Sequence, residues 1–433
     1  MPERGFKMIQ FKNLRWWIAG LLAIATALNY LDRQSFPVAV SRIRMDIPLT
    51  DQQFSQLNSL FLLAYAIMYM GGGKIMDWLG TRTGYAVMIV WWSAANFLHG
   101  TVATVMGLGA YRFLLGMGEG GGFPGSGKAV AEWFPPKERS FAFGIFNTGS
   151  SLGAVLAPPL IALIIVQFNW RWVFFLTGSV GFLWAVAWLK LYRPPGKNQR
   201  ITSEELEYIR RESDFSAVRP AEITIRWLDL FKYRQVWGLM AAKFLTDSAW
   251  YFFIFWLPKY LSDVRGLNIK EIGYYGWIPY ALMGVGSLSG GWLGSHLIRR
   301  GFTLDHSRKI ALALSAILMP VSLLITASPL SLAIVFFSAA FFAHQFWSAN
   351  VQTLAADIFP SSVVGSVEGL LGSAGSFGGM LFGLLVGSLV THHGYTPVFL
   401  MAGLLHPVAL LLILAVVRRI EPAQARGHVE VLA

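Results

Sequence analysis

The sequence predicts an all-α membrane protein with twelve transmembrane helices in two six-helix bundles. Of its 433 residues, 55% are hydrophobic and 13% are charged, whereas a soluble domain carries about 25% charged residues. The apolar residues form runs of about 20, the length that crosses a bilayer, and short motifs recur about half a chain apart. No single water-soluble core buries so much apolar surface, which excludes a soluble enzyme.

Twelve uninterrupted apolar stretches are the predicted spans. They cover residues 16–40, 53–76, 85–105, 107–132, 140–166, 172–192, 235–260, 272–298, 308–327, 329–354, 363–390 and 396–417. The first run resembles a signal peptide as far as Ala27, but it continues into polar residues and eleven more runs follow. We therefore expect an uncleaved first helix. The absence of cysteine excludes a disulfide scaffold, a thiolate metal site and a cysteine nucleophile.

The basic residues predict the orientation of these spans. With the N-terminus in the cytoplasm, 25 of the 35 Lys and Arg residues fall in cytoplasmic segments, six fall outside and four lie within spans. This asymmetry follows the positive-inside rule and places both termini in the cytoplasm. The formal charge of +12 is therefore explained by topology. We expect a lipid bilayer as partner and no nucleic acid.

Two motifs are duplicated along the chain. Residues 73–82 read GKIMDWLGTR and residues 291–300 read GWLGSHLIRR, and Phe134-Pro135 recurs as Phe359-Pro360. Between the halves lies the only long polar segment, which we interpret as a surface helix plus linker. This pattern predicts an N-terminal bundle (1–192), a cytoplasmic linker (193–234) and a C-terminal bundle (235–433). The bundles are expected to be related by a pseudo-twofold axis with a site between them.

The first repeated motif resembles the signature of the major facilitator superfamily in the loop between spans 2 and 3. The resemblance covers essentially the whole chain, and it implies a conformational latch at Gly73, Asp77 and Arg82 on the cytoplasmic side. Two positions depart from the pattern. Trp78 stands where a basic residue is usual, and the second copy has Ser295 in place of the acid.

Charged residues inside the bilayer are expensive and mark solute or proton paths. Span 1 carries Tyr30, Asp32 and Arg33, and Arg33 offers a planar donor fork that suits a carboxylate. Span 4 carries Arg112 and Glu119, which are too far apart for a tight intrahelical pair. Glu119 is a candidate proton carrier. The alternatives are structural: Arg33 pairs with a neighbouring acid, and Glu119 only neutralises Arg112 or Arg33.

The glycines around Glu119 match the dinucleotide-binding fingerprint, but no strand precedes them and they lie inside an apolar helix. We interpret them as sites of close helix approach.

Span 7 carries a polar and aromatic stripe suited to a sugar. Lys243, Asp247, Trp250 and Tyr251 share one face, where charged groups bind hydroxyls and aromatic faces stack on C–H surfaces. A structural pair of Lys243 with Asp247 is the alternative. Further substrate-binding candidates are polar or aromatic residues of other spans: Tyr65, Asn147, Ser150, His344, Trp347, Asn350, Ser373 and Ser376. For His344, a simple helix–helix contact is the alternative. We expect no catalytic and no metal-binding residues.

The motifs of spans 1 and 4, Asn-Tyr-Leu-Asp-Arg ending at Arg33 and Gly-Met-Gly-Glu-Gly-Gly-Gly-Phe-Pro around Glu119, resemble the anion:cation symporter family of this superfamily. The residues from Lys243 to Tyr260 resemble its hexuronate members most. The resemblance implies that Arg33 binds the substrate carboxylate and that Asp32 and Glu119 couple protons, and we group Arg112 with these two acids.

We therefore predict a proton-coupled symporter that imports sugar-acid monoanions, hexuronates preferred, by alternating access. An interior-negative membrane opposes anion entry by about 2.3 kcal/mol per charge per 100 mV, so accumulation needs a coupling cation. We expect a monomer in the inner membrane, with protons but no other cofactor. The alternatives are an importer of aldonates or aldarates and, disfavoured by Asp247 beside Lys243, an organic-anion or phosphate-ester exchanger. A membrane enzyme or sensor would need a catalytic cluster or a soluble domain, which the sequence lacks.

Overall fold

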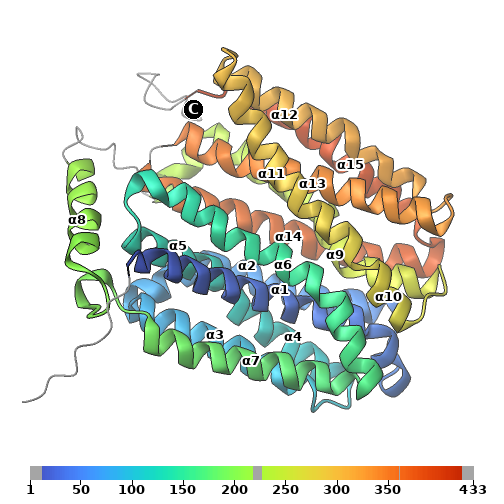
Figure 1. Ribbon diagram of the computed structural model, residues 1–433. Helices are drawn as coiled ribbons and strands as arrows, with labels where there is room; N and C mark the ends of the chain where they lie inside the picture. Colours follow the sequence, from blue (N-terminus) through green and yellow to red (C-terminus); the bar gives the residue numbers. More distant parts are fainter. Residues whose placement is uncertain (1–11, 218–226, 360, 422–433) are drawn as a thin grey trace, which may run out of the picture.

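A computed structural model describes residues 12–217, 227–359 and 361–421, and these segments are helical without a β-strand. Figure 1 shows two layers of long helices, with α1–α7 in one layer and α9–α15 in the other. Helix α8 belongs to neither layer and lies at one end of the molecule. The all-α prediction is confirmed for the described residues.

The N-terminal half of the chain forms the first layer. Its helices are α1 (Leu14–Asp46), α2 (Asp51–Leu79), α3 (Thr81–His99), α4 (Val105–Gly120), α5 (Gly122–Trp133), α6 (Pro136–Gln167) and α7 (Trp170–Leu191). A 3-10 turn (Pro195–Lys197) then leads to α8 (Ser203–Ala217). Helix α8 lies against the first layer, because Glu205 accepts hydrogen bonds from the backbone N–H groups of Leu14 and Arg15 at 2.8 and 3.1 Å.

The C-terminal half forms the second layer and starts with a 3-10 turn (Trp227–Lys232). Its helices are α9 (Arg234–Asp263), α10 (Ile269–Tyr275), α11 (Trp277–Arg299), α12 (Leu304–Leu318), α13 (Leu330–Ile358), α14 (Ser361–His393) and α15 (Thr396–Leu412). A 3-10 segment (Met319–Leu324) extends α12, and a π-helical turn (Ile413–Val417) extends α15.

Eight of the described helices are long and apolar enough to cross a membrane. They coincide with eight predicted spans, and the other four predicted spans fall on α3, on α4 with α5, on α9, and on α10 with α11. The number of twelve spans, their orientation and the bundle boundaries stay predictions. These predictions rest partly on the termini and the linker. Parts of these segments lie outside the described residues, namely 1–11, 218–226 and 422–433.

Two spans predicted as single helices are in fact interrupted. Helix α4 ends at Gly120 and α5 begins at Gly122. The reason is Pro124, which has no N–H to donate to the carbonyl of Gly120. Likewise α10 and α11 are separated at Gly276, because Pro279 cannot donate to the carbonyl four residues earlier. Each of these two predicted spans therefore consists of two helices separated by one residue.

The glycines of α4 allow close helix packing, as predicted. A Cβ atom on Gly116 would lie 2.3 Å from the Phe61 carbonyl oxygen, and one on Gly120 would lie 2.7 Å from the Tyr65 carbonyl oxygen. A larger residue at either position would push α4 away from α2. Gly127 differs, because its Cβ would meet the Phe143 ring at an ordinary 3.5 Å.

The repeated motifs occupy matching places in the two layers. Phe134 caps the C-terminus of α5, and Phe359 caps the C-terminus of α13, both with extended backbone. The first glycine-rich copy joins α2 to α3 through the single residue Gly80, whose φ of 73° favours glycine. The second copy ends α11.

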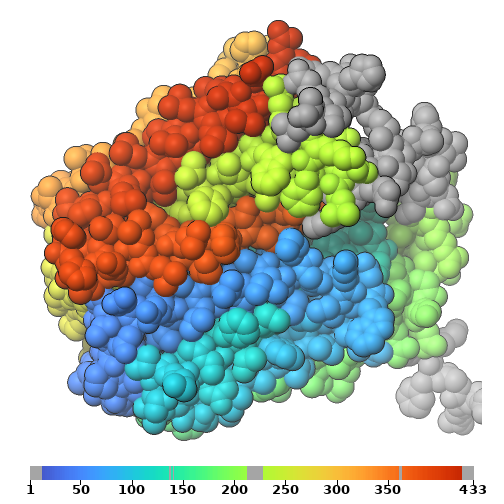
Figure 2. All heavy atoms as spheres, turned by 180° about the vertical axis from the view of Figure 1, so that it is seen from behind, coloured from blue at the N-terminus to red at the C-terminus, as the bar shows by residue number. Residues whose placement is uncertain are grey.

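The two layers meet along several helix pairs. Helix α2 packs against α14, α6 packs against α10 and α11, and α1 packs against α9. Ser59 donates a hydrogen bond to the Met380 carbonyl at 3.0 Å, and Ser373 donates one to the Ala66 carbonyl, also at 3.0 Å. Figure 2 shows the same two layers as adjoining halves of the molecular surface.

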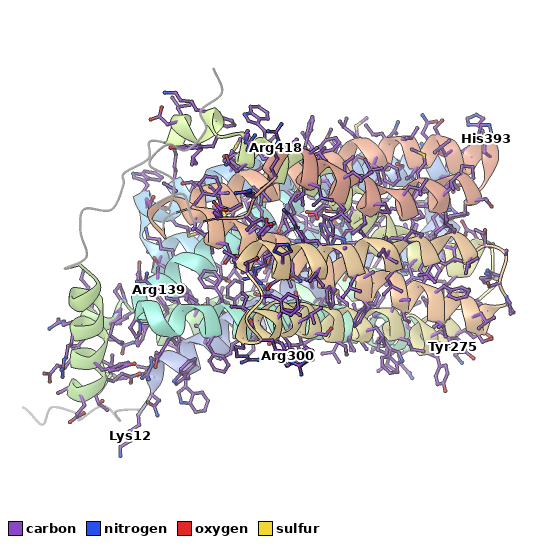
Figure 3. All side chains as sticks on the ribbon, turned by 90° about the horizontal axis from the view of Figure 1, so that it is seen from above. Lys12, Arg139, Tyr275, Arg300, His393 and Arg418 are labelled. Carbon is purple, nitrogen blue, oxygen red and sulfur yellow. The ribbon has the colours of Figure 1, made fainter. Side chains whose placement is uncertain are left out.

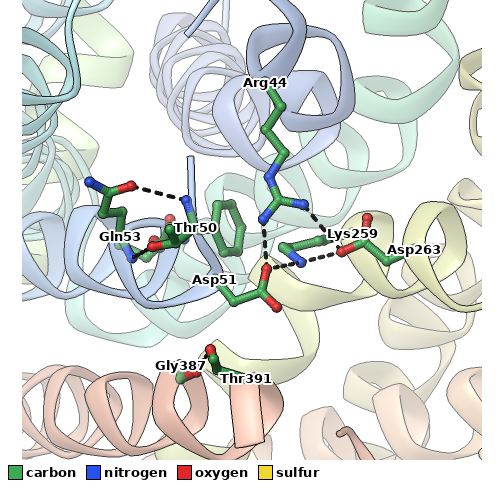
Figure 4. Close-up of polar contacts among 10 residues, drawn as sticks. Arg44, Thr50, Asp51, Gln53, Lys259, Asp263, Gly387 and Thr391 are labelled. Carbon is green, nitrogen blue, oxygen red and sulfur yellow. Dashed lines mark hydrogen bonds and ion pairs between the residues drawn. The ribbon is translucent and has the colours of Figure 1, made fainter. Parts of the chain in front are cut away.

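Four charged side chains join the layers at the end opposite α8, and we call them the external charge network (Figure 4). Asp51 of α2 pairs with Arg44 of α1 at 2.6 Å and with Lys259 of α9 at 2.6 Å. Asp263 of α9 pairs with Arg44 at 3.3 Å and also contacts Lys259.

The ends of the molecule are told apart in Figure 3. It shows Lys12 and Arg139 at the α8 end and Tyr275 and His393 at the other end. In the predicted orientation the network therefore closes the external side.

Candidate functional site

Arg33 and Glu119 form a buried ion pair between α1 and α4. The Arg33 Nε atom lies 3.0 Å from Glu119 Oε2, and an Arg33 terminal nitrogen donates to Asn29 Oδ1 at 3.1 Å. The Arg33 side chain is 2% exposed and that of Glu119 is not exposed. The sequence left two roles open for Glu119, a proton carrier and a structural partner of Arg33. This contact is compatible with both.

An aromatic box surrounds the Arg33 guanidinium. The rings of Tyr65, Tyr30 and Phe61 lie 4.6, 4.8 and 5.4 Å from it, distances that favour cation–π attraction. Tyr30 and Tyr65 were predicted for the substrate site, and the structure places both beside Arg33. The three rings lie around the guanidinium, whose Nε and one terminal nitrogen donate to Glu119 and Asn29.

Asp32 points away from this box toward α3 and α7. Its Oδ1 atom accepts a hydrogen bond from Asn96 at 2.7 Å, and Asn96 also donates to Thr177 at 2.7 Å. Asp32 Oδ2 has no hydrogen-bond partner among the described residues, and the side chain is fully buried. Asp32 is therefore a separate buried acid within the N-terminal half.

Arg112 does not pair with Glu119. It donates to Asn58 Oδ1 at 2.9 Å and lies over the Phe61 ring at 4.4 Å. Two of its nitrogens, Nε and one terminal nitrogen, have no hydrogen-bond partner within the described segments.

In the C-terminal half, Lys243 and Asp247 form an intrahelical pair on α9. Lys243 Nζ lies 2.9 Å from Asp247 Oδ2 and 3.1 Å from Oδ1. A Cβ atom on Gly375 of α14 would lie 2.1 Å from Asp247 Oδ2, so α14 leaves room for this carboxylate only because the residue is glycine. On the next turn, the Tyr251 hydroxyl lies 3.2 Å from Ser376 Oγ.

His344 of α13 joins this pair from the side. Its ring stacks on Trp250 with centroids 4.7 Å apart and an interplanar angle of 5°. His344 Nε2 lies 4.0 Å from Asp247 Oδ1, and His344 Nδ1 lies 3.2 Å from Nε2 of His406 on α15. The predicted residues Trp250, Asp247 and His344 therefore form one cluster, together with the unpredicted His406.

Tyr30 of α1 lies within electrostatic range of both charged clusters. Tyr30 is close enough to interact electrostatically with Arg33 and Glu119 in its own half and with Lys243 and Asp247 in the other. An acidic group with hydroxyls that lies beside Tyr30 would meet a cation from each half.

The other predicted binding residues lie elsewhere or make helix contacts. Asn350 donates to the carbonyls of Gly290 and Phe346 at 3.1 and 2.9 Å, which joins α13 to α11. Ser150 donates to the carbonyl of Asn147 at 2.7 Å within α6. The Trp347 ring packs edge-on against His406, with centroids 5.5 Å apart. Ser373 bonds across the layers, as described above. None of these contacts by itself marks a ligand site.

Within the residues that the structure describes, Asp77 and Arg82 of the predicted latch contact partners of their own half. Asp77 pairs with Lys128 of α5 at 2.6 Å, and Arg82 donates to the carbonyl of Leu189 on α7. A Cβ atom on Gly73 would meet nothing within 4 Å. The structure therefore leaves a latch between the halves at this end a prediction.

Five polar residues that contact or lie near the predicted charged residues were not predicted from the sequence. Asn58, Asn96 and Thr177 hold Arg112 and Asp32, His406 meets His344, and Glu368 of α14 interacts electrostatically with Lys243 and Asp247. All five lie within the predicted apolar spans, and His406 is the one titratable side chain of its stretch. That signal was available, but it does not tell which partner each residue meets.

Comparisons with known proteins place the chain in a family. The Major Facilitator Superfamily matches residues 22–304 and 301–431. The hexuronate transporter of Escherichia coli K12 is 34% identical over 426 residues, covering 96% of this chain and 98% of that protein. The galacturonate transporter of Dickeya chrysanthemi is 35% identical over 318 residues, covering 72% and 91%. The D-galactonate transporter of Escherichia coli O6:H1 is 29% identical, covering 87% and 89%.

A solved structure shows the same fold. The crystal structure of a bacterial homologue of the human lysosomal transporter Spinster, in an inward-facing and occupied conformation, superposes with a TM-score of 0.69 at 19% identity. The match covers 94% of this chain and 96% of that one. With its all-helical architecture and apolar helices, the chain is a multi-pass membrane protein that belongs to the major facilitator superfamily, a family of transporters and not enzymes.

Proposed function

We propose that the protein is a symporter that imports sugar-acid monoanions together with protons by alternating access, hexuronates preferred. It works as a monomer, with no cofactor besides the proton, in the inner membrane of a bacterial cell. The observation that carries the proposal is the pair of clusters between the layers: Arg33 with Glu119 on one side and Lys243 with Asp247 on the other. The substrates of the similar proteins, hexuronate and galacturonate, have the chemistry that this arrangement suits.

The Arg33–Glu119 pair supplies a direct link between proton and substrate. While Glu119 is ionised, it occupies the Nε edge of the guanidinium at 3.0 Å. Protonation of Glu119 removes its charge, so that the donor fork of Arg33 becomes available for a substrate carboxylate. Binding of the anion and of the proton therefore favour each other, as coupled transport requires.

The sugar ring would lie between the aromatic and hydroxyl groups of the two halves. Tyr30 and Tyr65 flank Arg33, while Trp250, Tyr251 and Ser376 lie beside the Lys243–Asp247 pair. Aromatic faces pack against the C–H surface of a sugar, and the carboxylate of Asp247 accepts hydrogen bonds from its hydroxyls. An acid at this position disfavours dianions such as phosphate esters.

Alternating access requires the external charge network to open and close. In this structure Asp51 and Asp263 join the halves through Arg44 and Lys259. Opening toward the outside breaks these ion pairs, and closing behind the bound substrate restores them.

The first experiment separates coupling from transport with Glu119→Gln in proteoliposomes. Uphill glucuronate uptake driven by a proton gradient needs protonation and release, so it should be abolished. Counterflow needs no proton release and should survive. If both survive, Glu119 carries no proton, and if both vanish, Glu119 is structural. Glu204→Gln on the exposed helix α8 is the control, because it removes a carboxylate far from the clusters.

The second experiment defines the substrate. Labelled glucuronate, galacturonate, galactonate and glucarate are offered to the same vesicles, with phosphate as a competitor. Uptake of hexuronates that exceeds that of aldonates and aldarates supports the proposal. Preference for galactonate or glucarate would assign the protein to another sugar acid, and competition by phosphate would favour an exchanger.

A further inference from the structure

The C-terminal half contains a row of titratable side chains that have no role in the proposed coupling through Glu119. It runs from Lys243 and Asp247 on α9 through His344 on α13 to His406 on α15. His344 is 2% exposed and His406 is 0% exposed. Burying two histidines in contact with each other next to a carboxylate costs free energy. Ionisable residues kept in a membrane bundle at such a cost are usually functional.

Hydrogen-bond accounting shows that this row has room for one more proton. A neutral imidazole has one N–H group and one bare nitrogen. Only one hydrogen fits between His344 Nδ1 and His406 Nε2, which lie 3.2 Å apart. If His406 donates it, His344 can direct its own N–H toward Asp247, and His406 Nδ1 is the bare nitrogen. That atom is buried and has no partner among the residues that the structure describes.

The charge of Lys243 controls whether that proton can bind. While Lys243 pairs with Asp247, the two charges cancel, and the ammonium group interacts unfavourably with a proton on either imidazole. A substrate carboxylate that attracts Lys243 would leave Asp247 as a buried, unpaired anion. Such a charge is strongly unfavourable, and a proton bound by the neighbouring histidine pair neutralises it.

The Lys243 ammonium group can move away from Asp247 toward a bound anion. Its ammonium group lies at the end of a flexible four-carbon chain, and Tyr30 lies within electrostatic range of Lys243 and of Arg33 across the layers. The other titratable groups that face this cluster are Tyr251 on α9 and Glu368 on α14. Glu368 interacts with Lys243 and would favour its return toward the C-terminal half after substrate release.

We propose that Asp247, His344 and His406 form a second proton-binding site, which takes up a proton when the anionic substrate binds Lys243. The inference rests on the proposed sugar-acid transport and deepens it. One proton is bound as the substrate carboxylate pairs with Lys243. The same proton is released when the substrate leaves and Lys243 returns to Asp247. The C-terminal half thus neutralises the substrate charge independently of Glu119.

The test counts the protons taken up when glucuronate binds the purified full chain in weakly buffered detergent with a pH indicator dye. We expect His406→Gln to take up one proton fewer per bound glucuronate than the wild type. Glutamine keeps a hydrogen-bonding group toward His344 but cannot hold a proton at neutral pH. Glu119→Gln should retain the proton that depends on His406.

His99→Gln is the matched control. His99 of α3 is equally buried, stacks on Phe174 and contacts the Ala95 carbonyl at 2.7 Å, but it lies in the N-terminal half. It should take up as many protons as the wild type. If His406→Gln binds glucuronate with an unchanged proton count, the second site is overturned, and a structural role for the histidines is left.

A second measurement keeps the proposal testable if His406→Gln does not fold. Infrared difference spectra of wild-type protein with isotope-labelled histidine should show imidazolium bands when glucuronate binds. Their absence overturns the second site even if transport is proton-driven. Failure of the proposed function looks different, since the wild type would then bind no glucuronate, which would overturn both proposals.

Discussion

At the scale of single residues, Arg33 is held on several sides by groups of its own half. Glu119 accepts from its Nε edge, Asn29 accepts from a terminal nitrogen, and the aromatic box of Tyr30, Tyr65 and Phe61 surrounds the plane. A lysine ammonium at this position would keep the charge but lose the flat fork that satisfies a carboxylate with two parallel bonds.

Arg33→Lys should therefore weaken glucuronate binding by roughly 1–3 kcal/mol, the scale of a charge-assisted hydrogen bond. The affinity is measured by calorimetry on the purified protein. The control is Arg171→Lys, at the external end, where Arg171 pairs with Asp46 at 2.6 Å and lies over Trp170. Equal glucuronate affinities for wild type and Arg33→Lys would remove Arg33 from the binding site.

At the scale of helices, the close contact of α4 with α2 depends on glycines, which have no side chain to separate the two backbones. The 2.3 Å distance from a Cβ atom on Gly116 to the Phe61 carbonyl cannot be relieved by a rotamer change, because the obstacle is backbone. Since α4 carries Glu119 and α2 carries Tyr65, this contact also sets the geometry around Arg33.

We expect Gly116→Ala to lower the free energy of unfolding by roughly 1–3 kcal/mol through overpacking, seen as a lower Tm in detergent. Gly20→Ala on α1 is the matched control, because its Cβ would meet nothing within 4 Å. Alanine there should leave the Tm unchanged or raise it, since alanine favours helix over glycine by about 1 kcal/mol. Similar losses in both variants would mean that α4 does not pack closely on α2.

The junction of α2 and α3 supports a second prediction at this scale. Asp77 binds Lys128 in the present state, and the latch hypothesis assigns it a partner in the other half once the cytoplasmic side closes. Asp77→Asn should then slow turnover while leaving glucuronate affinity within a few-fold. The two quantities are measured by counterflow rate and by calorimetry. Normal turnover would mean that this junction only sets topology.

At the scale of the whole molecule, the halves are joined by the charge network at the end opposite α8 and along their length by α2 and α14. Asp51→Asn weakens two ion pairs of the external charge network, with Arg44 and Lys259. Each partly exposed pair contributes about 0.5 kcal/mol, so the loss of both should raise the outward-open population roughly fivefold.

Maleimide labelling of Ser55→Cys reports this shift, because Ser55 is buried between α2 and α14 and the natural chain has no cysteine. Labelling should be faster in the Asp51→Asn background. Asp46→Asn is the control, since Asp46 lies at the same end but pairs with Arg171 and Trp170 of its own half. Equal labelling rates in the two backgrounds would show that the network does not hold the external side closed.

The sequence by itself determined the membrane-helical class, the positions of the long helices, the repeat and the identity of the charged candidates. These follow from local properties: the length of an apolar run, the number of charges in a loop, and the spacing of Lys243 and Asp247 on one helix face. The length of an apolar run does not show the helix breaks near Pro124 and Pro279, which lie inside two of the predicted spans.

Only the tertiary structure decided which of these charges meet. Arg33 pairs with Glu119, 86 positions away, and not with Asp32 beside it, which bonds with Asn96 of α3. His344 meets His406, 62 positions away, on a helix whose single histidine carried no recognisable pattern. The physical reason is that a buried polar group must find a partner on whichever helix packs against it. Helix packing depends on shape, including the glycines of α4 and α14, and this shape is not written in any one segment of the sequence.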